Sequence, residues 1–162
     1  MKIKNITHIA IFSALICILS TIAIPSPFGV PFTLQTFSVS LAGFVLGKKY
    51  GTICILIYLL LGSIGLPVFS GLTGGLGRFV SVTGGFLYGF IFLSFFSGYG
   101  NIFTSIIGLI ICHIIGILQF SLLTKNNFLS SFAIASLPYI IKDLISIFFA
   151  YFISKKLIKI IF

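Results

Sequence analysis

Acidic residues are almost absent from this sequence. The 162 residues contain one acid, Asp143, against ten lysines and arginines. Hydrolysis by paired carboxylates, magnesium-dependent phosphoryl transfer and most sites for hard metal ions each need more acidic side chains than that. We therefore expect a protein that is not an enzyme and that holds neither a metal ion nor a cofactor.

Cysteines are few, and a nucleotide-binding loop is missing. Cys17, Cys54 and Cys112 stand singly in apolar surroundings without CxxC spacing, which predicts free buried thiols rather than disulfides or metal ligands. The run GLTGGLGR is followed by Phe79, whereas a phosphate-binding loop needs Lys and then Ser or Thr at the corresponding place. Any ATP used by this protein must therefore be bound by another subunit.

Long apolar runs dominate what remains. Hydrophobic residues make up 59% of the chain, charged residues only 7%, and the mean hydropathy is +1.29. Crossing a bilayer core takes about 20 apolar residues in a helix. The sequence therefore predicts an all-α polytopic membrane protein with six transmembrane helices in a single domain, residues 1–162. We expect the spans near residues 6–24, 33–47, 51–65, 85–100, 102–123 and 138–153, with the turns before Pro138 kinked or oblique.

The basic residues sit at the ends of the predicted helices. This placement favours contact with anionic lipid headgroups and argues against nucleic acid as a partner. With six spans and a cytoplasmic N-terminus, seven lysines fall inside, against Arg78 and Lys125 outside. The seven are Lys2, Lys4, Lys48, Lys49, Lys155, Lys156 and Lys159. The positive-inside rule therefore predicts a multi-pass membrane protein with both termini in the cytoplasm.

Residues 65–85 form a glycine-rich segment that the same orientation places on the external side. It holds seven glycines, Pro67 and Arg78. Irregular backbone within a membrane protein must line a cavity or be covered by protein, because lipid offers no hydrogen-bond partners. We interpret the segment as part of a substrate pocket, with Ser70, Thr73, Gly74, Gly75 and Arg78 as candidate contacts. A long flexible loop is the alternative.

Asp143 is the residue in the predicted spans that most needs a partner. A bare carboxylate in a bilayer is costly, so it should face a cavity and be paired or hydrogen-bonded. Tyr139, Asp143 and Ser146 have the spacing i, i+4, i+7 and share one helix face, which suggests a polar stripe toward the pocket. The adjacent Lys142 is turned about 100° away, which predicts awkward direct pairing. A structural ion pair with Lys142 or Arg78 remains the alternative.

Three other polar side chains in the predicted spans, Gln35, Tyr58 and His113, need a hydrogen-bond partner or a cavity. Gln35 is expected either to bond another helix or to face the cavity, and the hydroxyl of Tyr58 should have a partner. His113 fits a proton relay or a hydrogen-bonded structural histidine.

Small residues recur at helical spacing in three predicted helices. Ala10 and Ala14 form an AxxxA pattern, which serves packing either against another subunit or within the monomer. Two further stripes predict close packing between helices: Thr36, Ser40, Gly43 and Gly47 in one helix, and Gly108, Cys112 and Gly116 in another.

An external cavity with a glycine-rich cover that carries Arg78, phenylalanine walls and one carboxylate suits a small solute with an apolar body, an anionic end and donors for a carboxylate. Binding of such a solute is one hypothesis. A proton-coupled secondary transporter of a small organic anion, using Asp143 and His113, is a second. A structural or pore-forming membrane protein is a third.

Five segments resemble one family closely and in order. They are GVPFTLQTF, LAGFVLG, YLLLGSIGLPVFSG, GGLGRFVSVTGGFLYGF and LPYIIKDLI. They resemble the BioY family, the biotin-specific S components of energy-coupling-factor (ECF) transporters. The resemblance implies a six-helix protein that captures biotin on the external side. It also implies delivery through a membrane scaffold subunit and two ATPase subunits, with Ala10 and Ala14 as the docking surface and Asp143 accepting from the ureido nitrogens.

The sequence departs from the family at the helix that carries this acid. Many relatives read PGDLIK where this chain reads IKDLIS, so Lys142 stands at the glycine position and Ser146 at the lysine position. The lysine that would meet the biotin carboxylate is therefore absent, and we hypothesise that Lys142 or Arg78 supplies the charge.

Overall fold

The computed structural model describes residues 3–26 and 30–161. Two residues named above lie outside these ranges: Lys2, one of the seven lysines counted for the orientation, and Gly29, the first residue of the segment GVPFTLQTF. The elements in chain order are α1 (Ile3–Thr21), β1 (Ala23–Ile24), β2 (Phe32–Thr33), α2 (Gln35–Ser63), the 3-10 turn η1 (Leu76–Arg78), α3 (Gly84–Ser97), α4 (Ile102–Thr124), α5 (Phe128–Ala135) and α6 (Leu137–Ile161). The all-α prediction is confirmed. The short antiparallel β1–β2 pair was not predicted.

Helix α2 is a helical hairpin that folds back at Gly47. Gly47 has φ 75° and ψ 175°, a conformation that glycine adopts without strain. Beyond it the two arms run antiparallel, since Gln35 Nε2 donates to the Tyr58 hydroxyl at 2.8 Å and a Cβ on Gly51 would lie 2.8 Å from Gly43 Cα. The prediction of two separate spans with a turn near residue 47 is therefore confirmed.

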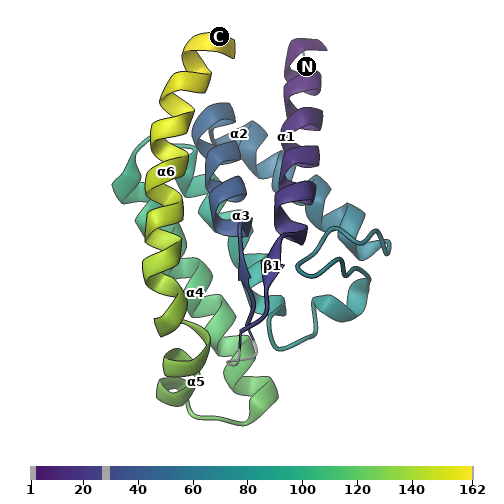
Figure 1. The fold of residues 1–162 in the computed structure, drawn as a ribbon, viewed down its shortest axis with the longest axis vertical. Helices are drawn as coiled ribbons and strands as arrows, with labels where there is room; N and C mark the ends of the chain where they lie inside the picture. The colour runs from purple at the N-terminus through teal and green to yellow at the C-terminus, as the bar shows by residue number, and fades with distance from the viewer. Residues whose placement is uncertain (1–2, 27–29, 162) are drawn as a thin grey trace.

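Both chain ends lie at one end of the helix bundle (Figure 1). The β1–β2 pair, the glycine-rich segment and α5 lie at or toward the other end (Figure 1). Among the described residues, α1 and α4 are each long and apolar enough to cross a membrane, α2 is so only over the combined length of its two arms, and α5 with α6 forms a further such unit bent by 51°. Helix α3 is apolar but only 14 residues long. The bend between α5 and α6 agrees with the kink predicted before Pro138.

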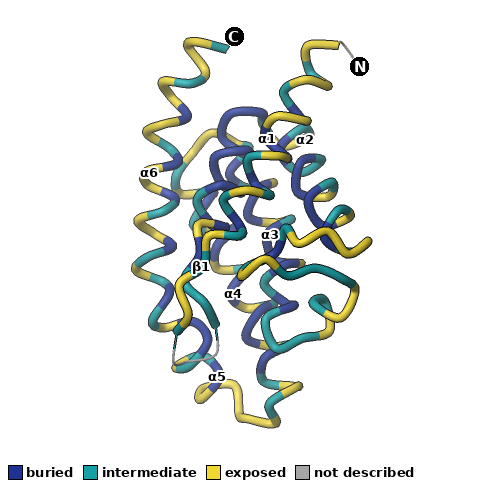
Figure 2. Tube along the Cα trace, turned by 45° about the vertical axis from the view of Figure 1, so that its right-hand side comes forward, coloured by how far each residue is buried: buried dark blue, intermediate teal, exposed yellow. Residues whose placement is uncertain are grey.

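Close helix packing depends on the small residues. A Cβ on Gly43 would collide with the Ser94 carbonyl of α3, and one on Gly89 would lie 2.6 Å from Cys112 Cα of α4. Buried residues therefore line the inside of the bundle, while exposed positions follow its outer faces (Figure 2). Many exposed positions are Ile, Leu and Phe, as expected of a multi-pass membrane protein.

Helix α1 leaves its AxxxA pattern uncovered. Ala10 and Ala14 are exposed, whereas Ile9, Phe12 and Ile16 of the same helix are buried. The AxxxA pattern therefore does not pack within the monomer. All three cysteines are free thiols; Cys54 and Cys112 are buried as predicted, whereas Cys17 is only half-buried.

Candidate substrate-binding site

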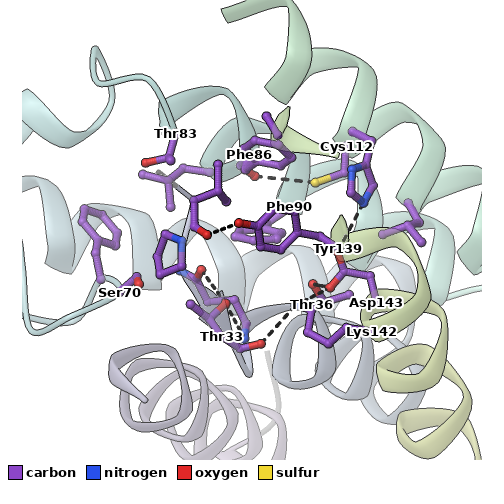
Figure 3. A pocket seen from close by; sticks show the side chains of 18 residues that line it. Thr33, Thr36, Ser70, Thr83, Phe86, Phe90, Cys112, Tyr139, Lys142 and Asp143 are labelled. Atoms are coloured by element: carbon purple, nitrogen blue, oxygen red, sulfur yellow. Dashed lines mark hydrogen bonds and ion pairs between the residues drawn. The ribbon is translucent and has the colours of Figure 1, made fainter. Parts of the chain in front are cut away.

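A cavity lies between the β1–β2 connection, the glycine-rich segment and helices α2, α3, α4 and α6 (Figure 3). Its apolar wall includes Phe69, Phe86, Leu87, Phe90 and Leu109. Its polar lining includes Thr33, Gln35, Thr36, Ser70, Thr83, His113, Tyr139, Lys142 and Asp143.

Asp143 is 5% exposed and holds three contacts from three helices. Thr36 Oγ1 of α2 donates to Oδ1 at 2.6 Å, Lys142 Nζ of α6 lies 2.5 Å from Oδ1, and His113 Nε2 of α4 lies 3.2 Å from Oδ2. A buried charge is tolerated when it is paired and hydrogen-bonded in this way.

The prediction that Lys142 pairs poorly with its neighbour was wrong. The lysine side chain is long enough to bring its ammonium back to the adjacent carboxylate, even though the two Cβ atoms point about 100° apart. The alternative of an ion pair with Lys142 is therefore correct, yet Asp143 also lines the cavity. Lys142 Nζ donates in addition to the Thr33 carbonyl at 3.1 Å, which ties α6 to β2.

His113 is 7% exposed and bonded through both ring nitrogens. Nδ1 lies 2.7 Å from Ser136 Oγ, at the bend between α5 and α6, and Nε2 faces Asp143. The ring packs edge-on against Phe86, with 5.7 Å between centroids. The hydrogen-bonded structural histidine is thus present, but it also lines the cavity.

Gln35 satisfies both of its predicted roles. It lines the cavity, and its amide bonds Tyr58 of the other arm of α2 while its Oε1 accepts from Thr33 at 3.0 Å. Tyr58 is fully buried behind it and does not line the cavity. The Tyr139 hydroxyl bonds the Val30 carbonyl and Ser26 Oγ, so it fastens α6 to the β1–β2 connection.

The glycine-rich segment contributes Ser70 to the cavity lining. The Ser70 hydroxyl is buried and has no hydrogen-bond partner among the described residues. Thr73, Gly74 and Gly75 shape the turn instead: Thr73 Oγ1 donates to the Ser70 carbonyl at 2.9 Å, and Gly75 has φ 93°.

Two further predicted residues stand apart from the cavity lining. Arg78, in η1, and Ser146, on α6, are both half-buried. Sequence reasoning missed several lining residues: Thr33, Thr36, Thr83, Phe86, Phe90 and Cys112. Thr36 had been assigned to a packing stripe. Thr36 could have been identified from the requirement that a lone buried acid such as Asp143 has for a hydrogen-bond donor from another helix.

The chain resembles one protein family along nearly its whole length. The model of the BioY family matches residues 1–161. The chain belongs to the BioY family. A probable biotin transporter BioY of Pyrococcus horikoshii is 37% identical over 161 residues, covering 97% of this chain and 98% of that protein. The biotin transporter BioY of Rhodobacter capsulatus is 42% identical over 137 residues, covering 76% and 72% of the two chains.

A solved structure has the same fold. The crystal structure of the S-component for biotin from an ECF-type ABC transporter is 31% identical and superposes with a TM-score of 0.90, covering 97% of this chain and 92% of that one. This likeness confirms the predicted S-component architecture.

Proposed function

We propose that this BioY-family chain is the substrate-capturing S component for biotin uptake and has no catalytic activity of its own. It binds biotin in the cavity around Asp143 and delivers it through an ECF module of one membrane scaffold subunit and two ATPase subunits. The observation that carries the proposal is a single buried carboxylate, already held in place by the protein, at the polar side of a cavity walled by phenylalanines.

The contacts of Asp143 leave room for one substrate donor. An ionised carboxylate has about four acceptor positions, two on each oxygen. Thr36 and Lys142 take both positions on Oδ1, and His113 takes one on Oδ2, so one position on Oδ2 is open among the described residues. A ureido N–H of biotin fits that position.

Lys142 complements the neighbouring part of the same ureido group. An ammonium has three donors, and two of them meet Asp143 and the Thr33 carbonyl. The third is available for the ureido oxygen. A donor beside an acceptor at this spacing matches the adjacent C=O and N–H of a cyclic urea, while Phe69, Phe86 and Phe90 suit the apolar ring and chain.

The carboxylate tail of biotin then points toward the glycine-rich segment. Ser70 and Asp143 lie on opposite sides of the cavity in Figure 3, and the Ser70 hydroxyl lacks a partner among the described residues. We assign the carboxylate to Ser70 and, once the glycine-rich segment closes over the ligand, to Arg78, the cation of that segment, which stands apart from the cavity lining in this structure. Arg78 is the better of the two basic candidates because Lys142 is already engaged beside Asp143.

We also propose a membrane orientation and an assembly for this chain. The end of the bundle that carries both termini lies on the cytoplasmic side of a bacterial plasma membrane, and the end that carries the cavity lies on the external side. Ala10 and Ala14, exposed on α1, offer the scaffold subunit a surface where another helix can approach closely. Closure of the glycine-rich segment over biotin would precede reorientation and release inward, with ATP hydrolysed by the partner subunits.

Calorimetric titration of the detergent-purified protein tests the proposal. Biotin and desthiobiotin share the ureido group and the carboxylate, so both should bind saturably with one site per chain. The Asp143→Asn variant should bind biotin more weakly. Absence of saturable binding by the folded wild-type protein would overturn the proposal.

Biotinamide tests the assignment of the carboxylate. Because it lacks the negative charge, Arg78→Ala should weaken binding of biotin but leave binding of biotinamide unchanged, whereas Lys142→Ala should weaken both. If Arg78→Ala affected neither ligand, the assignment to Arg78 would be wrong.

A further inference from the structure

We infer that His113 is the positioning residue of this site. Anchored by Ser136, it fixes the Asp143 carboxylate so that the open position on Oδ2 meets a substrate N–H. The identity of that substrate as biotin rests on the proposed function, but the arrangement of His113, Ser136 and Asp143 does not.

The contacts specify one protonation state of His113. An ionised Asp143 can only accept, so the hydrogen between Oδ2 and His113 Nε2 belongs to Nε2. Lys142 already balances the charge of Asp143, and a second cation in this buried cluster would be uncompensated. His113 is therefore neutral, with the proton on Nε2, and its Nδ1 accepts from the Ser136 hydroxyl at 2.7 Å.

The geometry also makes His113 the one protein contact that Oδ2 has among the described side chains. Thr36 and Lys142 both meet Oδ1, so His113 alone occupies an acceptor position on Oδ2 and decides which position on that oxygen stays open to a substrate. The His113 ring is held by Phe86 on one side and by the fully buried Ser136 on the other. Ser136 lies at the bend between α5 and α6, so the chain of hydrogen bonds joins that bend to the Asp143 carboxylate.

Nitrogen NMR of ¹⁵N-histidine-labelled protein in detergent, without ligand, tests the protonation state. The chain has two histidines, and the signals lost in His113→Gln identify those of His113. We expect an unprotonated Nδ1 and a protonated Nε2. A proton on Nδ1, in either the neutral or the charged ring, would overturn the inference. Because no biotin is present, this result is independent of the proposed function.

A double-mutant cycle tests the positioning role. His113→Leu removes the donor to Oδ2 and should lower biotin affinity roughly tenfold, the scale of a hydrogen bond to a charged group. In an Asp143→Asn background the same substitution should cost less than about twofold, because the group it positions is gone. His113→Gln keeps an amide N–H near the position of Nε2 and should recover most of the affinity.

The alternatives give different outcomes. If His113 only fills space, His113→Leu will weaken biotin binding equally in both backgrounds and His113→Gln will not rescue it. Where His113→Leu does not fold, Ser136→Ala serves in the same cycle, with an expected loss of about threefold that also vanishes in the Asp143→Asn background. If the folded wild-type protein does not bind biotin, the proposed function is wrong instead, and the NMR result alone then tests the inference.

Discussion

The ion pair between Lys142 and Asp143 predicts an unequal response when either partner is neutralised. Lys142→Met removes the ammonium 2.5 Å from Oδ1 and leaves an ionised carboxylate whose side chain is 8% exposed. Asp143→Asn leaves the ammonium unpaired, but the Lys142 side chain is 28% exposed and can turn its charge toward water or headgroups. Loss of the lysine should therefore destabilise the protein more than loss of the acid.

The size of the effect follows from the contacts that remain. Removing one partner of a buried pair costs about 3–5 kcal/mol. Thr36 and His113 still donate to Asp143, and the pair is partly exposed, so we expect about 2–3 kcal/mol for Lys142→Met. We expect about 1 kcal/mol for Asp143→Asn, because the amide oxygen still accepts. The double variant should lie within about 1 kcal/mol of the wild type, since it leaves no unpaired charge.

Thermal unfolding of the ligand-free protein in detergent measures these differences. At about 2–4 °C per kcal/mol for a chain of this size, Lys142→Met should lower Tm by about 4–12 °C. Lys156→Met is the matched control, because Lys156 is an exposed lysine of the same helix, and it should change Tm by no more than about 2 °C. Equal losses for Lys142→Met and Lys156→Met, or a double variant less stable than Lys142→Met, would refute the reasoning.

Three further outcomes are expected. Gly43→Ala should cost about 1–3 kcal/mol in thermal unfolding, because its Cβ collides with the Ser94 carbonyl, whereas Gly77→Ala meets nothing within 4 Å and should be neutral; equal Tm values would contradict this packing. Ala14→Trp should preserve biotin binding in the titration but abolish co-purification with the scaffold and ATPase subunits. Phe149→Trp, at an exposed position of α6, is the control and should preserve both. If the Ala14→Trp variant still assembled, the α1 surface would be excluded as the docking surface. Biotin uptake into vesicles should require the ATPase subunits, and uptake that survives their removal but collapses with the proton gradient would favour the proton-coupled alternative.

Helix positions were predictable because membrane-spanning segments must satisfy their own backbone hydrogen bonds. The break at Gly47 was readable from a glycine followed by two lysines between apolar runs. The predicted span 138–153 lies within α6, which continues beyond it to Ile161. Lys155 and Lys156 follow the apolar residues of the span, but they do not end the helix, because lysine is a good helix former.

The candidate site was predictable where polar residues were rare. Asp143 and Gln35 stand out in apolar runs, and both line the cavity. Phe86 and Phe90 do not stand out among twenty phenylalanines, and only the tertiary packing decides which of those rings face the cavity. Which polar groups meet was likewise invisible, because the contact from Thr36 to Asp143 spans 107 positions in the sequence.

The charge balance around Asp143 limits how an anionic ligand can lie. Asp143 and Lys142 neutralise one another, and we have inferred a neutral His113 from that balance, so this side of the cavity carries no net charge among the described residues. An anionic group placed here would be buried without a compensating cation, which is costly. A neutral ureido group exchanges one donor and one acceptor with the pair and adds no charge. The anionic end must therefore lie away from Asp143, and the cation within the glycine-rich segment is Arg78.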